Sequence, residues 1–198
     1  ANSLHIEVMG GHTEISDVVN RPVITVTGVG KVHKDKLVST GGLQPGDDLV
    51  MTKWAGLEGT SIIAEEKREE LLTRIPEQLI DAAAAMREYI SVVPEAAVAV
   101  DAGVTAMHDV TEGGIYGALW EVGEASGVGI IADLDKIPIR QETIELCEFY
   151  DINPYMLISS GCMLIGTPHG NMLVDRLAEH GIPAAVIGRA TEGNDRII

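Results

Sequence analysis

Residues 106–127, AMHDVTEGGIYGALWEVGEASG, place two acids, a hydroxyl and two glycines just before an amphipathic helical pattern. The start of a helix leaves several backbone N–H groups without partners and carries a partial positive charge, so it can bind an anion such as a phosphate. Asp109 and Glu112 would repel a bare phosphate, but carboxylates suit a Mg²⁺ ion that bridges phosphate oxygens. We therefore expect these two acids to be magnesium ligands. The expected phosphate contacts are Thr111, Gly113 and Gly114.

The same residues also fit an ordinary helix start. Thr111 would then be the N-cap residue, Glu112 would stabilise the positive end of the helix, and the glycines would allow a tight turn. His108 precedes Asp109 and could form an acid–base pair with it, which makes it a weak candidate for a catalytic residue. It could equally be a structural histidine that lines the loop. The sequence alone leaves these alternatives open.

A second glycine-rich turn lies near the start of the chain. Residues 9–19, MGGHTEISDVV, follow an expected strand and place Gly10, Gly11 and Thr13 beside acidic residues. The turn could bind phosphate through these three residues, or it could be a hairpin turn whose acids are solvated.

A third turn, residues 53–61, KWAGLEGTS, comes directly before an expected helix. Gly56, Gly59 and Thr60 resemble a loop that cradles phosphate, although the spacing and the trailing lysine of a P-loop are missing. A fourth, SSGCMLIGT, is a hydroxyl-rich turn that enters a strand. Each signal is weak by itself.

The elements that position these turns follow from apolar periodicity and from turn residues. Residues 105–114 form a loop before the helix in which Ile115, Ala118, Leu119 and Val122 share one face. The expected strands are 4–9, 22–29, 48–52, 128–132, 160–167 and 184–191. The other expected helices are 61–74, 76–90, 141–150, 153–158 and 171–180.

The two strands expected within residues 1–36 have almost nothing to cover them, because the first long helix begins only after residue 60. Two strands alone are marginally stable. The chain also starts without methionine and enters a strand almost at once. We therefore expect residues 1–36 to be the end of an upstream domain and residues 37–198 to be a complete domain.

The composition narrows the function classes. Fourteen Lys+Arg against thirty Asp+Glu give a formal charge of −16, which opposes general binding of nucleic acid. Aromatic residues make up 4% of the chain, and this favours a compact α/β or α+β domain over a base-stacking surface. Cys147 and Cys162 lack the spacing of a metal or disulfide framework. With no apolar run near the roughly 20 residues of a membrane span, we expect a cytoplasmic protein.

Read in order, the segments GGHTE, TVTGVG, PGD, GLEGT, HDVTEGG, SSGCMLIGT and VIGRATEG resemble the aminoimidazole ribonucleotide (AIR) synthetase superfamily. The resemblance covers essentially the whole chain and is closest to hydrogenase expression/formation proteins of the HypE type. Those proteins carry an Asp-x-Thr-x-Gly-Gly turn, which Asp109, Thr111, Gly113 and Gly114 match. The chain departs from them at Glu112, where HypE commonly has Arg, and it ends in GNDRII without a terminal cysteine.

The resemblance implies an α/β (α+β) fold, with a mixed sheet covered by helices at residues 37–198 and a two-strand remnant of an ATP-binding, dimerising domain at residues 1–36. It implies ATP in the cleft between the two domains, with Mg²⁺ on acidic residues. His12 stands where kinase relatives have a metal-binding Asp, so the metal is expected on the other turn.

The function implied is ATP-dependent activation and dehydration of a carbamoyl group in hydrogenase maturation. The substrate would be a small molecule or a carbamoylated protein, and the partners a second copy of the chain and another maturation protein. This part alone, with one wall of the cleft, is expected to be inactive. The alternatives are an AIR synthetase, a small-molecule kinase, or a non-catalytic scaffold of the same superfamily.

Overall fold

The computed structural model describes residues 6–198 of the chain, which divides into two compact units, Ala1–Leu37 and Val38–Ile198. In the first unit, residues 6–33 are extended backbone and bends, and a short 3₁₀ turn, η2, follows at Lys34–Lys36. The expected strands do not form at 6–9 or 22–29, and residues 4 and 5 lie outside the described part. The physical reason is that a strand needs a hydrogen-bonded neighbour. Here the apolar side chains, such as Val26 at 85% exposure, have nothing to pack on.

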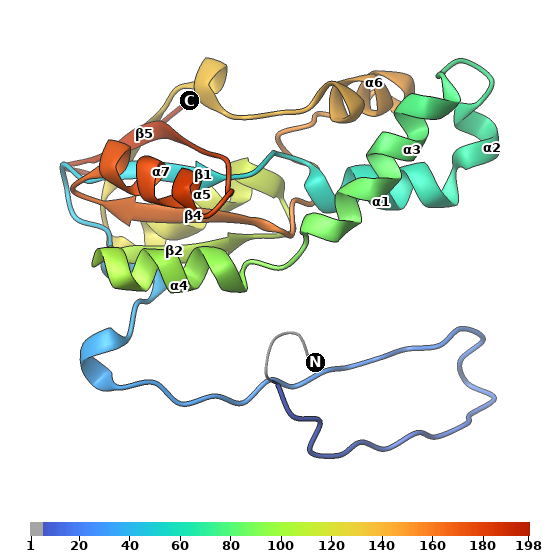
Figure 1. Cartoon of the computed structure of the whole chain (residues 1–198), viewed down its shortest axis with the longest axis horizontal. Helices are drawn as coiled ribbons and strands as arrows, with labels where there is room; N and C mark the ends of the chain where they lie inside the picture. The colour runs from blue at the N-terminus through green and yellow to red at the C-terminus, as the bar shows by residue number, and fades with distance from the viewer. Residues whose placement is uncertain (1–5) are drawn as a thin grey trace. The chain divides into compact units, whose positions relative to one another are not determined.

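Within Val38–Ile198 the chain forms a six-stranded mixed sheet in the order β2-β4-β1-β5-β3-β6 (Figure 1). Only the β3–β6 pair is parallel within this unit. The strands are β1 Asp48–Thr52, β2 Ala106–Val110, β3 Gly129–Ala132, β4 Cys162–Thr167, β5 Ala184–Thr191 and β6 Arg196–Ile197. The predicted sheet covered by helices is therefore confirmed for this unit. Residues 106–110, expected as a loop, are instead the edge strand β2.

Helices cover both faces of this sheet and extend beyond one end of it. The α-helices are α1 Leu57–Glu66, α2 Arg68–Leu71, α3 Glu77–Ala85, α4 Val93–Ala102, α5 Gly114–Ser126, α6 Gln141–Tyr150 and α7 Gly170–Glu179; the 3₁₀ turns are η3 Thr40–Gly42, η4 Met86–Tyr89 and η5 Leu134–Lys136. Helix α4 was not expected. Residues 153–158, expected as a helix, form a turn in which the Asn153 side chain accepts a hydrogen bond from the Tyr155 amide at 2.9 Å.

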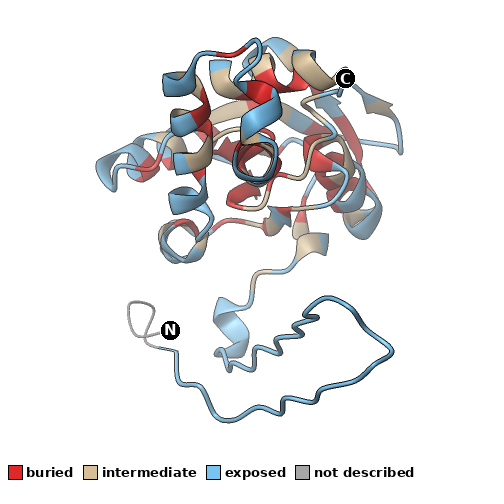
Figure 2. Cartoon of the chain, turned by 90° about the vertical axis from the view of Figure 1, so that its right-hand side faces the viewer, coloured by how far each residue is buried: buried red, intermediate tan, exposed pale blue. Residues whose placement is uncertain are grey.

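Alternation along β1 divides the core of the 38–198 unit into two layers. Figure 2 shows the buried residues, in red, within this unit, whereas residues 6–37 are exposed. Leu49 and Met51 pack with Ile115 and Leu119 of α5, whereas Val50 faces α4 and α7 on the other side of the sheet. A third cluster joins α1, α3 and α6 through Leu71, Ile80, Ala83 and Leu146. The sheet therefore presents a rigid edge at which several loops meet.

Candidate functional site

The predicted acidic turn lies at one edge of the sheet. Strands β2 and β4 are antiparallel, with Val110 opposite Cys162, and β4 is also antiparallel to β1. The carboxyl ends of β1 and β2 therefore lie beside the amino end of β4. Three segments that are far apart in the sequence meet there: residues 53–56, 111–114 and 155–161.

Helix α5 begins at two glycines in the left-handed region. Gly113 is the N-cap with φ 82°, and Gly114 follows with φ 59°. No side chain caps the helix, and the Gly114 amide donates instead to the carbonyl of Thr111 at 3.1 Å. The alternative in which Thr111 is the N-cap is therefore wrong, because the glycines let the backbone close the turn by itself.

The loop at residues 155–161 covers part of this helix start. A Cβ on Gly114 would lie 2.4 Å from the carbonyl oxygen of Tyr155, so only glycine fits between the helix and the loop. The Tyr116 amide donates to the same carbonyl at 3.3 Å. Two N–H groups of the first turn are thus already bonded within the protein, and the surface left open is that of Glu112 and Gly113, which are exposed.

The two carboxylates of the turn remain free. Asp109 and Glu112 are both exposed, and neither forms an ion pair within residues 6–198. Across the same residues, no three side chains of the His, Cys, Asp and Glu types gather into a metal site. Magnesium is usually held by one or two carboxylates together with substrate phosphates and water. Two exposed carboxylates are therefore better suited to a Mg²⁺ ion that is also bound to a phosphate than to a metal ion held by the protein alone.

His108 lies on the other face of β2 from Asp109, because neighbouring residues of a strand point to opposite sides. Its Nε2 lies 2.7 Å from Oε2 of Glu121 on α5, and its Nδ1 lies 3.2 Å from the Thr40 hydroxyl. Both ring nitrogens are occupied and the side chain is 17% exposed. The structure therefore gives His108 a structural role, and the expected acid–base pair with Asp109 does not form.

The third turn is closed by the protein itself. Gly56 donates its amide to the Ser159 hydroxyl at 2.7 Å, and Gly59 donates to the carbonyl of Ile158 at 3.0 Å. The Thr60 hydroxyl is fully buried and donates to that of Thr143 at 2.9 Å. The local sequence looks like a phosphate loop, but these residues pack the start of α1 against residues 154–159. Phosphate contact by these three residues is not supported.

The second turn belongs to the first unit. Gly10, Gly11 and Thr13 are exposed there, and a Cβ on either glycine would meet no atom within 4 Å. Their contribution to a phosphate site stays a prediction.

The fourth turn noted in the sequence begins at Ser159, whose structural role the sequence did not reveal, and the Lys53–Glu95 pair was not expected at all. Ser159 is buried; its hydroxyl accepts from Gly56 and donates to the carbonyl of Leu157 at 2.7 Å. Lys53 and Glu95 form a buried ion pair. Their signals in the sequence were a lysine directly after an apolar strand and a single acid in an Ala/Val-rich run.

An aromatic and cationic stack borders the same region. The Arg140 guanidinium lies 4.8 Å from the centre of the Trp54 ring, and Tyr89 meets Trp54 edge-on at 5.3 Å. Arg140 also forms two hydrogen bonds to Glu142, of 3.0 and 2.7 Å, which lower the pKa of that carboxyl. Burial raises the pKa of Cys162 to about 12 and that of Cys147 to about 11. Neither cysteine is therefore a reactive thiolate.

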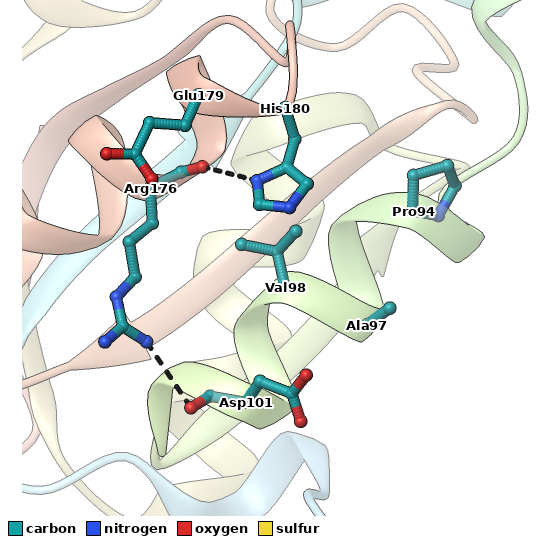
Figure 3. A pocket seen from close by; sticks show the side chains of 7 residues that line it. All are labelled: Pro94, Ala97, Val98, Asp101, Arg176, Glu179 and His180. Atoms are coloured by element: carbon teal, nitrogen blue, oxygen red, sulfur yellow. Dashed lines mark hydrogen bonds between the residues drawn. The ribbon is translucent and has the colours of Figure 1, made fainter.

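A separate groove of about 560 Å³ runs between α4 and α7 (Figure 3). Arg176 of α7 and His180, just after α7, face Val98 and Asp101 of α4 across it. None of the predicted site residues lines this groove, so it is not the predicted nucleotide site. Among residues 6–198, no helix has the length and apolar character needed to cross a membrane.

Residues 44–198 match the family described as "AIR synthase related protein, C-terminal domain". The chain is 28% identical to a protein named as a hydrogenase expression/formation protein from Methanocaldococcus jannaschii, over 98% of this chain and 56% of that protein. It is 24% identical to a carbamoyl dehydratase HypE from Rhodobacter capsulatus, over 96% of this chain and 55% of that protein. The chain thus spans a little over half the length of these relatives.

Solved structures share the fold. The E. coli HypE structure has a TM-score of 0.65 and 22% identity, covering 81% of this chain and 48% of that chain. A HypE structure in complex with ATP has a TM-score of 0.61 and 19% identity, over 82% and 48%. A HypE–HypF complex has a TM-score of 0.58 and 22% identity, covering 80% of this chain and 51% of that chain. A thiamine-monophosphate kinase from Stenotrophomonas maltophilia has a TM-score of 0.66 and 18% identity, covering 84% of this chain and 54% of that chain. At these identities the likeness establishes the fold and not the reaction.

Proposed function

Because the chain belongs to the AIR synthase related family through its C-terminal domain at residues 44–198, we propose that it is the C-terminal part of an ATP-dependent enzyme of the HypE type. Residues 1–36 would be the end of that enzyme's N-terminal domain and residues 37–198 its C-terminal domain. The reaction proposed is the ATP-dependent activation and dehydration of a carbamoyl group. The names of the two relatives support this choice, since one is named for hydrogenase expression/formation and the other as a carbamoyl dehydratase.

The observation that carries the proposal is the turn at the start of α5. Asp109 and Glu112 are exposed carboxylates without ion-pair partners in residues 6–198; Asp109 lies near the end of β2, and Glu112 directly precedes an exposed Gly113 with a left-handed backbone. Free acids beside the positive end of a 13-residue helix would hold Mg²⁺ and the phosphate oxygens that it bridges. ATP, when bound, supplies the phosphoryl group that turns a carbamoyl oxygen into a leaving group.

In this proposal the chain's own residues act by position and charge. Asp109 and Glu112 would hold the metal ion and orient the phosphates, and the backbone at Gly113 would let the phosphates approach closely. The loop at 155–161 excludes water from the back of the turn, because Gly114 is buried against it. Phosphate contacts by Gly10, Gly11 and Thr13 of the first unit stay part of the proposal. The catalysis would be mostly positioning and charge stabilisation.

The partners proposed are a second copy of the chain and a maturation protein that delivers the carbamoyl group. The solved HypE–HypF complex supports the second, because that relative of the fold assembles with another protein. We propose a cytoplasmic location on the composition and cysteine content.

The experiment measures Mg²⁺-dependent ATP turnover by the full-length protein that contains this chain, with Asp109→Ala as the test variant. Losing one of two metal-binding carboxylates should lower turnover by about tenfold or more, which corresponds to about 1.4 kcal/mol. Asp175→Ala is the matched control, since Asp175 is an exposed acid on α7 with no ion pair in the described residues. Turnover that needs no Mg²⁺, or an Asp109→Ala protein as active as the control, would contradict the proposal.

A small-molecule kinase is the second candidate, favoured by the shared fold of thiamine-monophosphate kinase. The two reactions differ in where the phosphoryl group ends. A carbamoyl dehydration releases the carbamoyl oxygen as inorganic phosphate, whereas a kinase leaves the phosphoryl group on its acceptor. Measuring free phosphate per ADP formed distinguishes them. A protein with no turnover, whose nucleotide affinity does not change in Asp109→Ala, would instead be a scaffold.

A further inference from the structure

Lys53 and Glu95 form an ion pair inside the protein. The Lys53 Nζ lies 2.6 Å from Oε1 of Glu95, and the two side chains are 5% and 3% exposed. Removing two charges from water is costly, and their attraction offsets this only with good geometry and further hydrogen bonds. The pair therefore needs an explanation beyond ordinary surface electrostatics.

The Lys53 ammonium bonds to more than its partner. It donates to the carbonyl of Tyr89 at 2.7 Å and to that of Ser91 at 2.9 Å. Its three N–H groups are thus divided between Glu95, at the start of α4, and the segment that joins η4 to α4. The ammonium fixes residues 89–91 against the end of β1.

The backbone of Lys53 is also unusual. Its φ of 55° lies in the left-handed region, which residues other than glycine rarely adopt. Its amide donates to the carbonyl of Pro183 at 2.8 Å, which holds this conformation in place. Such strain persists only where surrounding structure imposes it, and it is concentrated at functional sites.

The pair is not arranged for maximum stability. The second carboxylate oxygen of Glu95, Oε2, is buried and has no hydrogen-bond partner within residues 6–198. An acceptor left in this state costs free energy. Apolar residues of similar volume often replace buried ion pairs without loss of stability. A role in positioning the neighbouring backbone therefore explains this pair better than a contribution to stability does.

The fixed segment supports the loop beside the α5 turn. A Cβ on Gly161 would lie 2.9 Å from the carbonyl oxygen of Tyr89 and 3.0 Å from the Cα of Ile90, so the loop rests directly on residues 89–91. The other end of this loop accepts the Tyr116 amide and encloses Gly114. A continuous series of contacts thus runs from the Lys53 ammonium to the start of α5.

We propose that the Lys53–Glu95 pair is a positioning device, which holds residues 89–91 so that the loop at 155–161 keeps the start of α5 in place for a nucleotide. The inference rests on the proposed function for its last step. Lys53 and Glu95 touch no substrate and act only through the loop.

The test is the double variant Lys53→Met/Glu95→Leu, which replaces the ion pair by apolar groups. We expect a melting temperature near that of the wild type, because the buried charges are removed together. Hydrogen exchange of the amides of Gly56, Gly59, Tyr116 and Cys162, which bond to or within the loop, should become at least about tenfold faster, a factor equivalent to about 1.4 kcal/mol of local opening. Wild-type exchange at these amides in the folded double variant would overturn the inference.

The second measurement is nucleotide affinity in the full-length protein, with a non-hydrolysable ATP analogue as the probe. The double variant should bind it about tenfold more weakly at unchanged thermal stability; faster exchange with unchanged affinity also overturns the inference. The matched control is Arg196→Met/Glu124→Leu, which removes a 3.0 Å ion pair between β6 and the second half of α5 and should leave the four amides and the affinity unchanged. If the wild-type protein binds no nucleotide, the proposed function is wrong. The hydrogen-exchange rates still decide whether the Lys53–Glu95 pair holds the loop.

A milder variant covers the case in which the double variant does not fold. Glu95→Gln keeps the shape of the side chain and one acceptor oxygen, but it removes the charge that holds the ammonium. It should change exchange at the same four amides in the same direction by a smaller factor. If exchange in the folded Glu95→Gln protein matches the wild type, the pair does not position the loop.

Discussion

Gly114 is the residue on which the geometry of the acidic turn depends most directly. Its φ of 59° disfavours any side chain, and a Cβ there would also meet three backbone atoms of residues 155–157 at 2.4 to 2.8 Å. Backbone cannot move aside as a flexible side chain can, so both effects act together.

Gly114→Ala should therefore lower the free energy of unfolding by about 2–5 kcal/mol, the sum of left-handed strain and overpacking. Gly127→Ala is the matched control at the other end of α5. Gly127 has φ 65°, but a Cβ there meets no atom within 4 Å, so only the strain of about 1–2 kcal/mol applies. Urea unfolding of both variants gives the comparison. Equal losses would show that the loop does not press on the helix start.

Within the candidate site, the residues with local sequence signals were predicted more accurately than those with distant partners. The Asp-x-Thr-x-Gly-Gly spacing marked the start of α5, because the glycine pair and the apolar face that follows are local signals. Gly56 and Gly59 gave a similar local signal, but the structure does not support a phosphate contact by them. Their amides bond to Ser159 and Ile158, about a hundred positions later in the chain. No local pattern reveals a partner at that distance.

Among the elements, those with a clear apolar period were predicted well. Strands β1 and β5 have the predicted bounds, and the predicted face of α5 is buried at Ile115, Ala118, Leu119 and Val122. Helix α4 was missed because its sequence, VPEAAVAVDA, is apolar nearly all round and shows no helical period. Strand β2 was missed because it is an edge strand whose sequence, AMHDV, places the polar residues His108 and Asp109 next to each other and so shows no apolar alternation.

Helix α6 provides the pH-dependent prediction, because Glu142 of its first turn is bonded to Arg140 just before it. Arg140 lowers the pKa of the Glu142 carboxyl below its ordinary value of 4.5. A carboxyl with a lowered folded-state pKa stabilises the protein above its unfolded-state pKa. That contribution is lost as the pH falls through the folded-state value.

Glu142→Gln should therefore melt at a lower temperature than the wild type at pH 7, and the difference should shrink as the pH falls below about 4.5. Melting temperatures of both proteins between pH 7 and pH 3 test this. The effect should be small, because Arg140 keeps 35% of its side-chain surface exposed and water screens the pair. A difference that grows toward pH 3 would have the wrong sign and would contradict the assignment.

At the scale of the whole molecule, the two units differ in how much they bury. Every buried hydrophobic residue described lies at Leu43 or later, whereas apolar side chains in residues 6–37, such as Ile15 at 97% and Val29 at 95%, are exposed. Exposed β-forming segments of this kind need a partner strand or become sites of aggregation. This contrast agrees with the proposal that residues 1–36 complete a different domain.

Removing residues 1–37 should leave a protein that folds alone, with a melting temperature within about 2 °C of the full chain, since a shift of that size corresponds to less than about 1 kcal/mol for a domain of this size. The truncated protein should also stay monomeric at concentrations at which the 198-residue chain associates, because the apolar segments are gone and most of the acidic residues remain. Calorimetry and light scattering after size-exclusion chromatography measure the two effects. A melting temperature several degrees lower would mean that residues 1–37 stabilise the 38–198 unit. Equal self-association of both proteins would mean that the associating surface belongs to that unit.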